Sequence, residues 1–294
     1  MEIKKAQRMK AKLRLGIAAP SGAGKTYSAL LMAFGLGGKI GLIDTEHGSG
    51  HLYAHLGDYD VIGIEAPYTV AKYTEAIRTF EDAGYSTIII DSLSHAWAGD
   101  GGLLDKQGKI ADRPGANGYA AWRTITPEHN ALVDAMLRSP AHIIATMRSK
   151  QDYVLEVNDK GKQTPKKVGL APVQREGMEY EFTVMLDVDM QHVASSSKDR
   201  TGLFDGRYFK INQATGQELL TWLETGEAGP DVAAILRLLS GSATVELLKS
   251  NFESAMLMLP ASHQAALTKA KNARYRELVP AVPAKTPEFE DLPQ

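Results

Sequence analysis

Short apolar runs alternate with amphipathic stretches along the first half of the chain. The runs have the length and β-branched content of buried strands, and the stretches between them repeat apolar residues at helical spacing. Strands that alternate with helices build parallel βαβ units, with helices on both faces of the sheet. The predicted strands are 13–19, 39–44, 61–65, 87–91 and 142–146, and the predicted helices are 25–34, 70–83 and 119–138.

The pattern changes after residue 147. The strand-like pieces are separated by turn residues, and Asn-Asp-Lys-Gly at 158–161 has the chemistry of a hairpin turn. We therefore expect an antiparallel extension of the sheet, followed by a helix at 216–224 that closes the core. The strand-like pieces are 152–157, 166–170, 181–189 and 207–211.

Beyond a Gly- and Pro-containing linker at 226–230, apolar residues return at helical spacing and predict three amphipathic helices. The last residues combine four prolines with several acids, a composition typical of disorder. The expected organisation is a basic N-terminal arm at 1–12, a core at 13–226, a small helical bundle at 231–278 and a disordered tail at 279–294.

The composition of the 294-residue chain is that of a globular protein, with 44% hydrophobic and 23% charged residues. Its formal net charge of -2 means that contact with nucleic acid would depend on a local basic patch. The chain has no cysteine, which excludes disulfides and thiolate metal sites. The N-terminus is too basic for a signal peptide, and no apolar run approaches the roughly 20 residues of a membrane helix. We expect a soluble intracellular protein.

The strongest motif follows the first predicted strand. Residues 19–26 read Ala-Pro-Ser-Gly-Ala-Gly-Lys-Thr, a match to the Walker A pattern except that Ala19 replaces the first glycine. The glycines let backbone N–H groups approach phosphate oxygens, and the following helix directs its positive N-terminus at the same anion. Lys25 is expected to contact the β- and γ-phosphates of ATP, and Thr26 to bind Mg²⁺. The candidate nucleotide-binding residues are Pro20, Ser21, Gly22, Ala23, Gly24, Lys25, Thr26 and Tyr27.

Two carboxylates complete the predicted site. Asp91 ends the strand at 87–91 and suits the Walker B role of supporting Mg²⁺. Glu46 follows the strand at 39–44, where a carboxylate can orient the attacking water as a general base. The alternatives are an ordinary strand-end aspartate and a surface or helix-capping glutamate. His47 and His51 have no partners at metal-ligand spacing and are expected to be polar contacts.

Taken in order, these motifs resemble the RecA family over about residues 12–225. The segment 41–47, Gly-Leu-Ile-Asp-Thr-Glu-His, is similar to the RecA segment that carries the catalytic glutamate, and Asp91-Ser92 is similar to its Walker B motif. Ser-Lys-Asp-Arg at 197–200 resembles the motif by which one RecA subunit contacts the ATP of its neighbour. The resemblance implies that Lys198 and Arg200 act in this way. Two cations two residues apart on an extended segment also point to one face, although a solvated surface pair is the alternative.

The expected fold class is therefore α/β: a RecA-like P-loop NTPase core with a mostly parallel sheet and an antiparallel extension, plus a small C-terminal helical bundle. Three departures from RecA stand out. Only about a dozen residues precede the first strand, and RecA's C-terminal domain is not recognisable. Met147 stands where RecA has its sensor glutamine, so Arg148 is the candidate sensor. The overall pattern is most similar to phage-encoded RecA-core ATPases associated with single-strand annealing and recombination.

Two loops of RecA hold DNA, and their equivalents here follow Asp91 and Met147. The first, 98–118, is glycine-rich and contains Lys106, Lys109 and Arg113. The second, 149–175, is basic and contains Tyr153, a combination that suits phosphate pairing and base stacking with single-stranded nucleic acid. A solvated hairpin is the alternative. The candidate DNA-binding residues are Lys150, Lys160, Lys162, Lys166, Lys167 and Arg175.

The sequence thus predicts an ATPase with ATP and Mg²⁺ as cofactors, acting on single-stranded DNA as a homo-oligomer with ATP sites between subunits. The C-terminal bundle is expected to contact a single-strand-binding or annealing protein, or simply to cap the core. The expected location is the cytoplasm, that of a bacterial host if the protein is phage-encoded. Alternatives are a P-loop kinase, a nucleotide-switched loader of a partner protein, and a DNA motor such as a helicase or packaging ATPase.

Overall fold

The computed structural model describes residues 5–114, 118–157, 163–227, 230, 232–259 and 263–279, with the backbone alone for 151–157, 163–169 and 233. The chain divides into two compact units, 10–226 and 1–9 with 227–294. The predicted disordered tail falls almost entirely outside the described residues.

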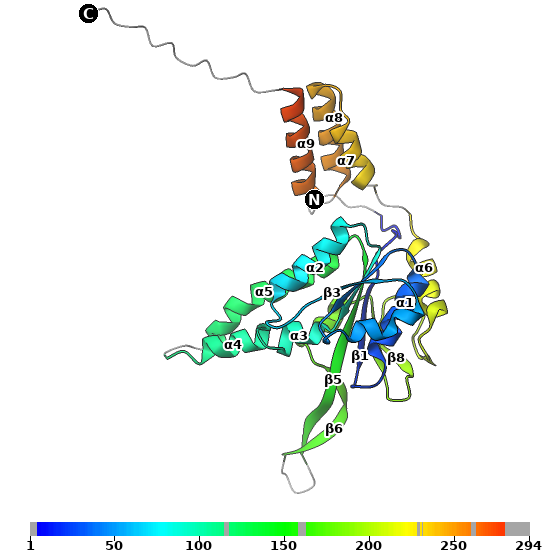
Figure 1. Ribbon diagram of the computed structural model, residues 1–294, viewed down its shortest axis with the longest axis vertical. Coiled ribbons are helices and arrows are strands. Elements are labelled where there is room, and N and C mark those ends of the chain that lie inside the picture. The colour runs from blue at the N-terminus through cyan, green and yellow to red at the C-terminus, as the bar shows by residue number, and fades with distance from the viewer. Residues whose placement is uncertain are drawn as a thin grey trace, which may run out of the picture. The chain divides into compact units, whose positions relative to one another are not determined.

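Unit 10–226 is built around one sheet (Figure 1). The strand order is β3-β2-β4-β5-β1-β7-β8-β9, with β6 paired to β5. Along the sheet, the neighbouring strands β3, β2, β4, β5, β1 and β7 pair in parallel. The pairings β5–β6, β7–β8 and β8–β9 are antiparallel. The strands are β1 (Arg14–Ala19), β2 (Ile40–Asp44), β3 (Asp60–Gly63), β4 (Thr87–Asp91), β5 (His142–Val157), β6 (Gln163–Pro172), β7 (Val184–Val188), β8 (Ala194–Asp199) and β9 (Tyr208–Phe209).

Helices cover both faces of this sheet, as the alternating sequence pattern predicted (Figure 1). In β4, Ile88 and Ile90 face the core formed with α2, α3 and α5, and Ile89 faces the core formed with α1 and α6. A strand buried on both faces is apolar at every position for this reason. The helices are α1 (Lys25–Leu36), α2 (Val70–Asp82), α3 (Leu93–Ala98), α4 (Leu103–Ala111), α5 (Gly118–Arg138) and α6 (Gln213–Glu224), and the 3-10 helices are η1 (Ser49–Leu56) and η2 (Met178–Glu181).

Strand β5 corrects one expectation. The sequence predicted a strand that ends at residue 146 and a separate strand at 152–157, whereas β5 is continuous over 16 residues. Its first half pairs in parallel with β1 and β4, and from Ser149 onward it pairs antiparallel with β6. The expected turn at 158–161 lies outside the described residues, but the two strands beside it pair as a hairpin.

The predicted loop at 98–118 is also corrected, because it contains helix α4. Leu103 of α4 is buried, and Ile110 packs against the same core. The glycines at both ends of this segment made it resemble a loop, although the residues between them form a helix.

The unit that contains 227–294 has three helices among its described residues: α7 (Val232–Ser240), α8 (Val245–Met258) and α9 (Gln264–Leu278). They share a small apolar core of Leu239, Leu248, Ala255, Leu259 and Leu267.

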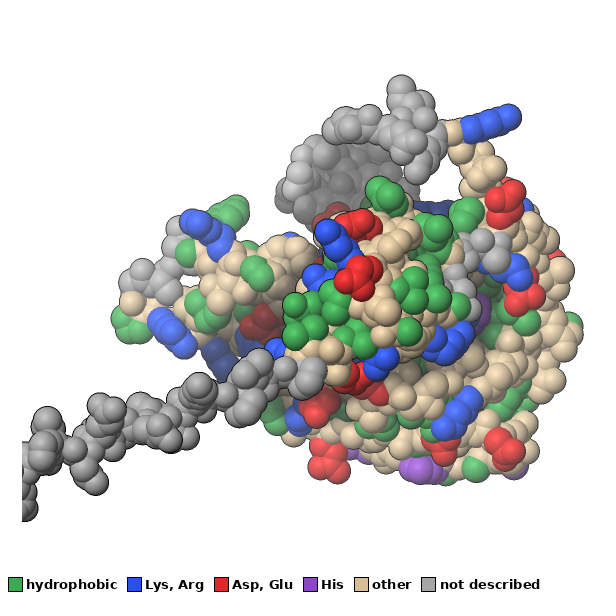
Figure 2. All heavy atoms as spheres, turned by 90° about the horizontal axis from the view of Figure 1, so that it is seen from above, with side chains coloured by type: hydrophobic (Ala, Val, Ile, Leu, Met, Phe, Trp, Pro, Cys, Tyr) green, Lys and Arg blue, Asp and Glu red, His purple; other side chains and the backbone are tan. Residues whose placement is uncertain are grey.

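Charged side chains of both signs are mixed with hydrophobic ones on the face that Figure 2 shows. Contact with a polyanion would therefore depend on a local cluster. Among the described residues, no helix is both long enough and apolar enough to span a membrane.

Candidate nucleotide site

The segment between β1 and α1 has the shape of a phosphate-binding loop. Gly22 and Gly24 both have a φ of 82°, a conformation that strains residues with a Cβ. Helix α1 begins directly after this turn at Lys25, so its free N–H groups and positive dipole end face the loop. Ala19 is buried at the end of β1, which shows that its methyl group fits where the motif has glycine.

Lys25, the first residue of α1, donates a hydrogen bond to the Pro20 carbonyl of the loop at 3.2 Å. Burial lowers the pKa of Lys25, while the charges of Asp91 and Glu46 oppose this shift. The two carboxylates predicted from the sequence are thus close enough to act on the predicted phosphate-binding lysine.

Thr26 and Asp91, the predicted Mg²⁺ residues, are in contact. The Thr26 hydroxyl donates to Asp91 Oδ2 at 2.5 Å, and the Thr146 hydroxyl donates to Oδ1. Asp91 is only 1% exposed, and burial raises the pKa of its carboxyl group against the effect of these hydrogen bonds. A threonine and a carboxylate beside a phosphate loop are a donor set that suits Mg²⁺. The sequence did not reveal Thr146, whose only signal was its position at the end of a neighbouring strand.

Glu46 lies on a segment whose backbone is hydrogen-bonded to the Asp44 side chain. Asp44 is buried, and its carboxylate accepts from the backbone N–H groups of Glu46 at 2.7 Å and Gly50 at 3.0 Å. Because Asp44 and Asp91 are paired in the β2–β4 register, Glu46 lies at the same sheet edge as the Mg²⁺ residues.

The Glu46 side chain is paired with Arg148, the predicted sensor. Arg148 donates from Nε to Oε1 at 3.1 Å and from Nη2 to Oε2 at 2.7 Å. Burial tends to raise the pKa of Glu46, but hydrogen bonding and charge from Arg148, with charge from His95 and Lys25, lower it overall. Met147, by contrast, is 1% exposed and belongs to the apolar core.

His95 supports this segment from helix α3, a contact that the sequence did not suggest. Its Nδ1 lies 2.7 Å from the Thr45 hydroxyl, and its ring stacks on Tyr68 with centroids 4.7 Å apart. Burial, followed by the charge of Arg148, lowers the pKa of His95. The imidazole of His95 thus packs against the segment that leads from β2 to Glu46.

A cavity of about 420 Å³ opens beside the phosphate loop. Tyr27 and Tyr53 meet edge to face at its wall, with centroids 6.0 Å apart. His192, also in the wall, lies 3.1 Å from the Ala23 carbonyl through Nδ1. Aromatic walls with a few polar groups suit a planar nucleobase. The lining residues are Gly22, Gly24, Tyr27, Ser28, Tyr53, His192, Lys210 and Ile211.

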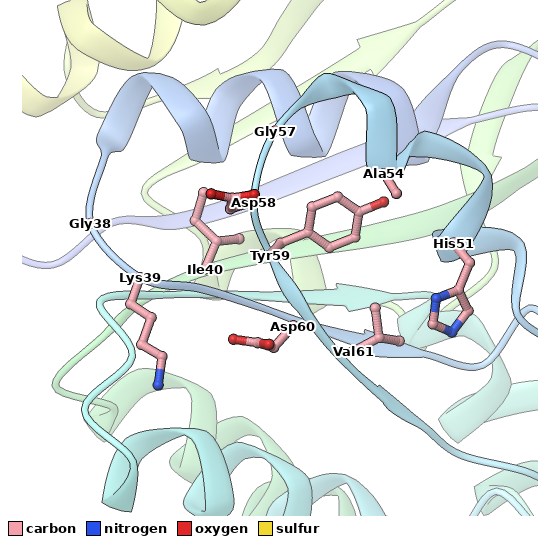
Figure 3. Close-up of a pocket in the computed structure, with 10 residues that line it drawn as sticks. All are labelled: Gly38, Lys39, Ile40, His51, Ala54, Gly57, Asp58, Tyr59, Asp60 and Val61. Atoms are coloured by element: carbon pink, nitrogen blue, oxygen red, sulfur yellow. The ribbon is translucent and has the colours of Figure 1, made fainter.

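A larger cavity of about 600 Å³ lies elsewhere, between the α1–β2 turn and the segment before β3 (Figure 3). It contains no residue of the phosphate loop. Lys39 in its wall lies 4.0 Å above the Tyr85 ring, and the Tyr85 hydroxyl donates to Asp60. Because it lacks the phosphate loop, its size alone does not make it the nucleotide site.

Lys198 and Arg200 do not lie beside the phosphate loop of their own chain. Strand β8 is antiparallel to β7, and the backbone places Arg200 level with Arg14, at the opposite end of β1 from the loop. At roughly 3.3 Å per residue this separation is about 17 Å along the strand. Both cations donate to the Tyr180 carbonyl, so they point away from the loop.

The predicted DNA-binding residues have mixed outcomes. Lys106 and Lys109 form ion pairs with Glu128 at 2.5 Å and Asp105 at 2.6 Å, which weakens the case for the first loop. Lys150 is exposed, whereas Arg175 lies over the Trp122 ring at 5.9 Å. Lys160 and Lys162 lie outside the described residues. Lys166 and Lys167 lie on β6, but their side chains, like that of Tyr153, fall outside the described part of the structure.

A glycine-rich phosphate loop between a strand and a helix, with a threonine–aspartate pair beside it, defines a P-loop ATPase. A protein-family model described as an AAA domain matches residues 11–221, and the chain belongs to this family of nucleotide-binding ATPases, which use ATP with Mg²⁺. No curated protein matches the sequence. The likeness to RecA and the connection with DNA remain predictions.

Proposed function

We propose that this protein is a RecA-like ATPase that acts on single-stranded DNA in recombination or annealing. The observation that carries the hydrolytic part is the placement of Glu46 at the sheet edge that holds Lys25, Thr26 and Asp91. A P-loop protein that only binds nucleotide has no need of a second carboxylate held at this position by a dedicated buried aspartate.

Each residue has a definite task in this proposal. Backbone N–H groups of 22–26 and the Lys25 ammonium bind the phosphates, and Thr26 and Asp91 hold Mg²⁺, which neutralises phosphate charge when bound. Glu46 accepts a proton from the attacking water. The cavity lined by Tyr27 and Tyr53 receives the nucleobase.

Lys198 and Arg200 complete the site from a neighbouring subunit. Their placement at the far end of β1 supports this role, because they cannot contact phosphates bound to their own chain. Cations supplied by a neighbour stabilise charge that develops on the transferred phosphoryl group.

The hairpin β5–β6 supports the DNA-binding part. It projects from the sheet as a continuation of the strand that carries Thr146 and Arg148, and its sequence is basic (Figure 1). A ligand on this hairpin would therefore be connected by backbone to the nucleotide site. The two rival functions, a nucleotide-switched loader and a DNA motor, would use the same nucleotide site. A loader would place a partner protein, whereas a motor would translocate DNA.

The deciding experiment measures ATP turnover and the affinity for a fluorescent ATP analogue, with and without a thymidine homopolymer. Lys25→Ala should lose both activities, and Glu46→Gln should keep binding but lose about 100-fold or more in turnover. Lys39→Ala, a lysine distant from the loop, is the matched control. Turnover that does not respond to DNA would refute the DNA-binding part and leave the ATPase.

The neighbour's role has its own test. Lys25→Ala and Arg200→Ala should each be inactive alone, but mixing them should restore about a quarter of wild-type activity, because a quarter of the interfaces then combine an intact loop with intact cations. No recovery on mixing, in subunits that do exchange, would place Arg200 outside the ATP site.

A further inference from the structure

Arg148 lies where three parts of the protein meet. Its backbone N–H donates to the Ser94 hydroxyl of α3 at 2.9 Å, and its carbonyl accepts from Val173 N–H at the end of the hairpin at 2.6 Å. Its side chain makes the two hydrogen bonds to Glu46. Any shift of the hairpin relative to α3 must therefore act on the residue that holds Glu46.

In the register of β5, the strand partner changes from one residue to the next at this position. Arg148 is the last residue of β5 that pairs in parallel with β1, opposite Ala19 at the entry to the phosphate loop. Ser149 is the first that pairs antiparallel with β6, opposite Pro172. Arg148 is thus both the inner end of the hairpin and a neighbour of the phosphate loop.

The pairing with Arg148 works against the proposed role of Glu46. Both carboxylate oxygens accept from one guanidinium, a geometry that fixes the orientation of the carboxylate and occupies two of its roughly four acceptor sites, which leaves fewer to orient water. The same contact lowers the pKa of Glu46, and a carboxylate with a lower pKa is a weaker base.

The pair is also accessible enough to open. The Arg148 side chain is 47% exposed and that of Glu46 is 25% exposed. Exposed ion pairs are weak because water competes for both partners. A modest movement of the hairpin can therefore exchange this contact for another.

We propose that Arg148 is a latch that holds Glu46 inactive at rest, and that hydrolysis begins when movement of the β5–β6 hairpin turns the guanidinium away. The inference rests on the proposed role of Glu46 as the base. Arg148 is a positioning residue in this scheme, since it acts on water only through Glu46.

The latch and a γ-phosphate sensor predict opposite results for Arg148→Gln. Loss of a latch raises basal turnover, whereas loss of a sensor lowers it. We expect Arg148→Gln to hydrolyse ATP about tenfold faster than wild type without any effector. Arg148→Lys, which keeps the charge but not the two-pronged geometry, should give a smaller rise. The matched control is Arg138→Gln, which breaks the exposed pair with Asp134 and should leave the rate unchanged.

Two further measurements separate a latch from a general structural effect. Adding Glu46→Gln to Arg148→Gln should abolish the rise, because the gain acts through Glu46. The acidic limb of the turnover–pH profile should move to higher pH in Arg148→Gln, and a ¹³C titration of the Glu46 carboxyl group should show the same upward change in its pKa.

The outcomes distinguish this inference from the proposed function. A wild-type enzyme that hydrolyses ATP, with Arg148→Gln equal or slower, overturns the latch and leaves the ATPase in place. An unchanged Glu46 titration in Arg148→Gln overturns the latch whatever the rates are. If neither protein hydrolyses ATP and Lys25→Ala binds nucleotide as wild type does, the proposed function itself fails and the latch fails with it.

Discussion

Asp44 illustrates what single residues contribute to this site. Among the described residues, Asp44 has no hydrogen bond to the phosphate loop. Both of its carboxylate oxygens nevertheless accept from backbone N–H groups of the segment that carries Glu46. A movement of this loop would leave the buried carboxylate without its two backbone donors, which costs free energy, so the carboxylate fixes the loop conformation. The position of the Glu46 backbone therefore depends on a neighbour two residues away.

Asp44→Asn tests this dependence. The amide offers one acceptor oxygen and one NH₂ group, so one of the two backbone N–H groups loses its acceptor. We expect the turnover number to fall about 10- to 100-fold while nucleotide affinity changes less than about twofold. Steady-state kinetics and a binding titration measure both, with exposed Asp58→Asn as control. Equal losses of affinity and turnover would show a general collapse of the site.

His142 gives a prediction for pH. Burial, with smaller effects of Lys12 and Arg14, lowers its pKa from 6.5 to about 4. The folded protein thus disfavours the protonated form, and the free energy of unfolding falls as pH drops from about 6.5 towards 4, by up to about 3 kcal/mol. Asparagine at 142 can still accept from the Leu13 N–H but does not titrate.

Urea unfolding of wild type and His142→Asn at several pH values between 4 and 7 measures this contribution. The stability difference between the two proteins should shift in favour of His142→Asn as pH falls. Parallel curves would mean that His142 titrates normally in the folded protein.

The sequence could single out candidate site residues where chemistry restricts the residue type. Lys25, Thr26 and Asp91 were identified because phosphate and Mg²⁺ need those groups, and the structure brings them together. Thr146 and His95 were missed because a hydroxyl or imidazole that acts by contact alone has no sequence pattern. Their roles depend on strand register and helix placement.

At the scale of elements, the packing of α1 against α6 depends on two facing glycines. A Cβ on Gly35 would lie 2.1 Å from the Gln213 carbonyl oxygen and 2.7 Å from Gly216 Cα. The helix that begins at the phosphate loop is thus fixed at its other end by backbone contact. Helices this close leave no room for a methyl group.

Gly35→Ala should therefore destabilise the protein by about 2–4 kcal/mol. Gly108→Ala in α4 is the matched control, because a Cβ added there would meet nothing within 4 Å and alanine favours helix by about 0.5–1 kcal/mol. Chemical denaturation of both variants provides the comparison. Equal effects would show that α1 and α6 can separate at no cost.

Element prediction failed where the environment of a strand changes along its length. After the buried Met147, the sequence Arg-Ser-Lys at 148–150 loses the apolar pattern because β5 leaves the buried sheet, but its backbone pairing continues with β6. Hydrophobic periodicity records burial and not hydrogen bonding, so it ended the strand too early. Strand β8 was not among the predicted strand-like pieces, although the segment with Lys198 and Arg200 was expected to be extended, because its serines lack the β-branched content of the central strands.

At the scale of the molecule, all residues of the candidate site belong to unit 10–226. The helices α7–α9 have their own small apolar core. Sequence composition predicted a change of organisation near residue 226, since linkers are rich in glycine and proline. It could not predict what the second unit contacts.

A chain limited to residues 10–226 should accordingly bind a fluorescent ATP analogue with an affinity within about twofold of the full chain. Fluorescence titration measures this, with full-length Lys25→Ala as the negative control. A folded 10–226 fragment that no longer binds would show that the second unit contributes to the nucleotide site.

The placement of Lys198 and Arg200 at the far end of β1 has a consequence for stoichiometry. If they serve a neighbour, each subunit carries two unlike half-sites, and copies must join head to tail. An open row of such copies always has one bound nucleotide that no neighbour completes, at one end. Short rows would leave a large share of their subunits idle and long rows almost none, whereas a closed ring would leave none. Turnover per subunit would then report how many ends exist in solution, and its rise with protein concentration would distinguish rows from rings.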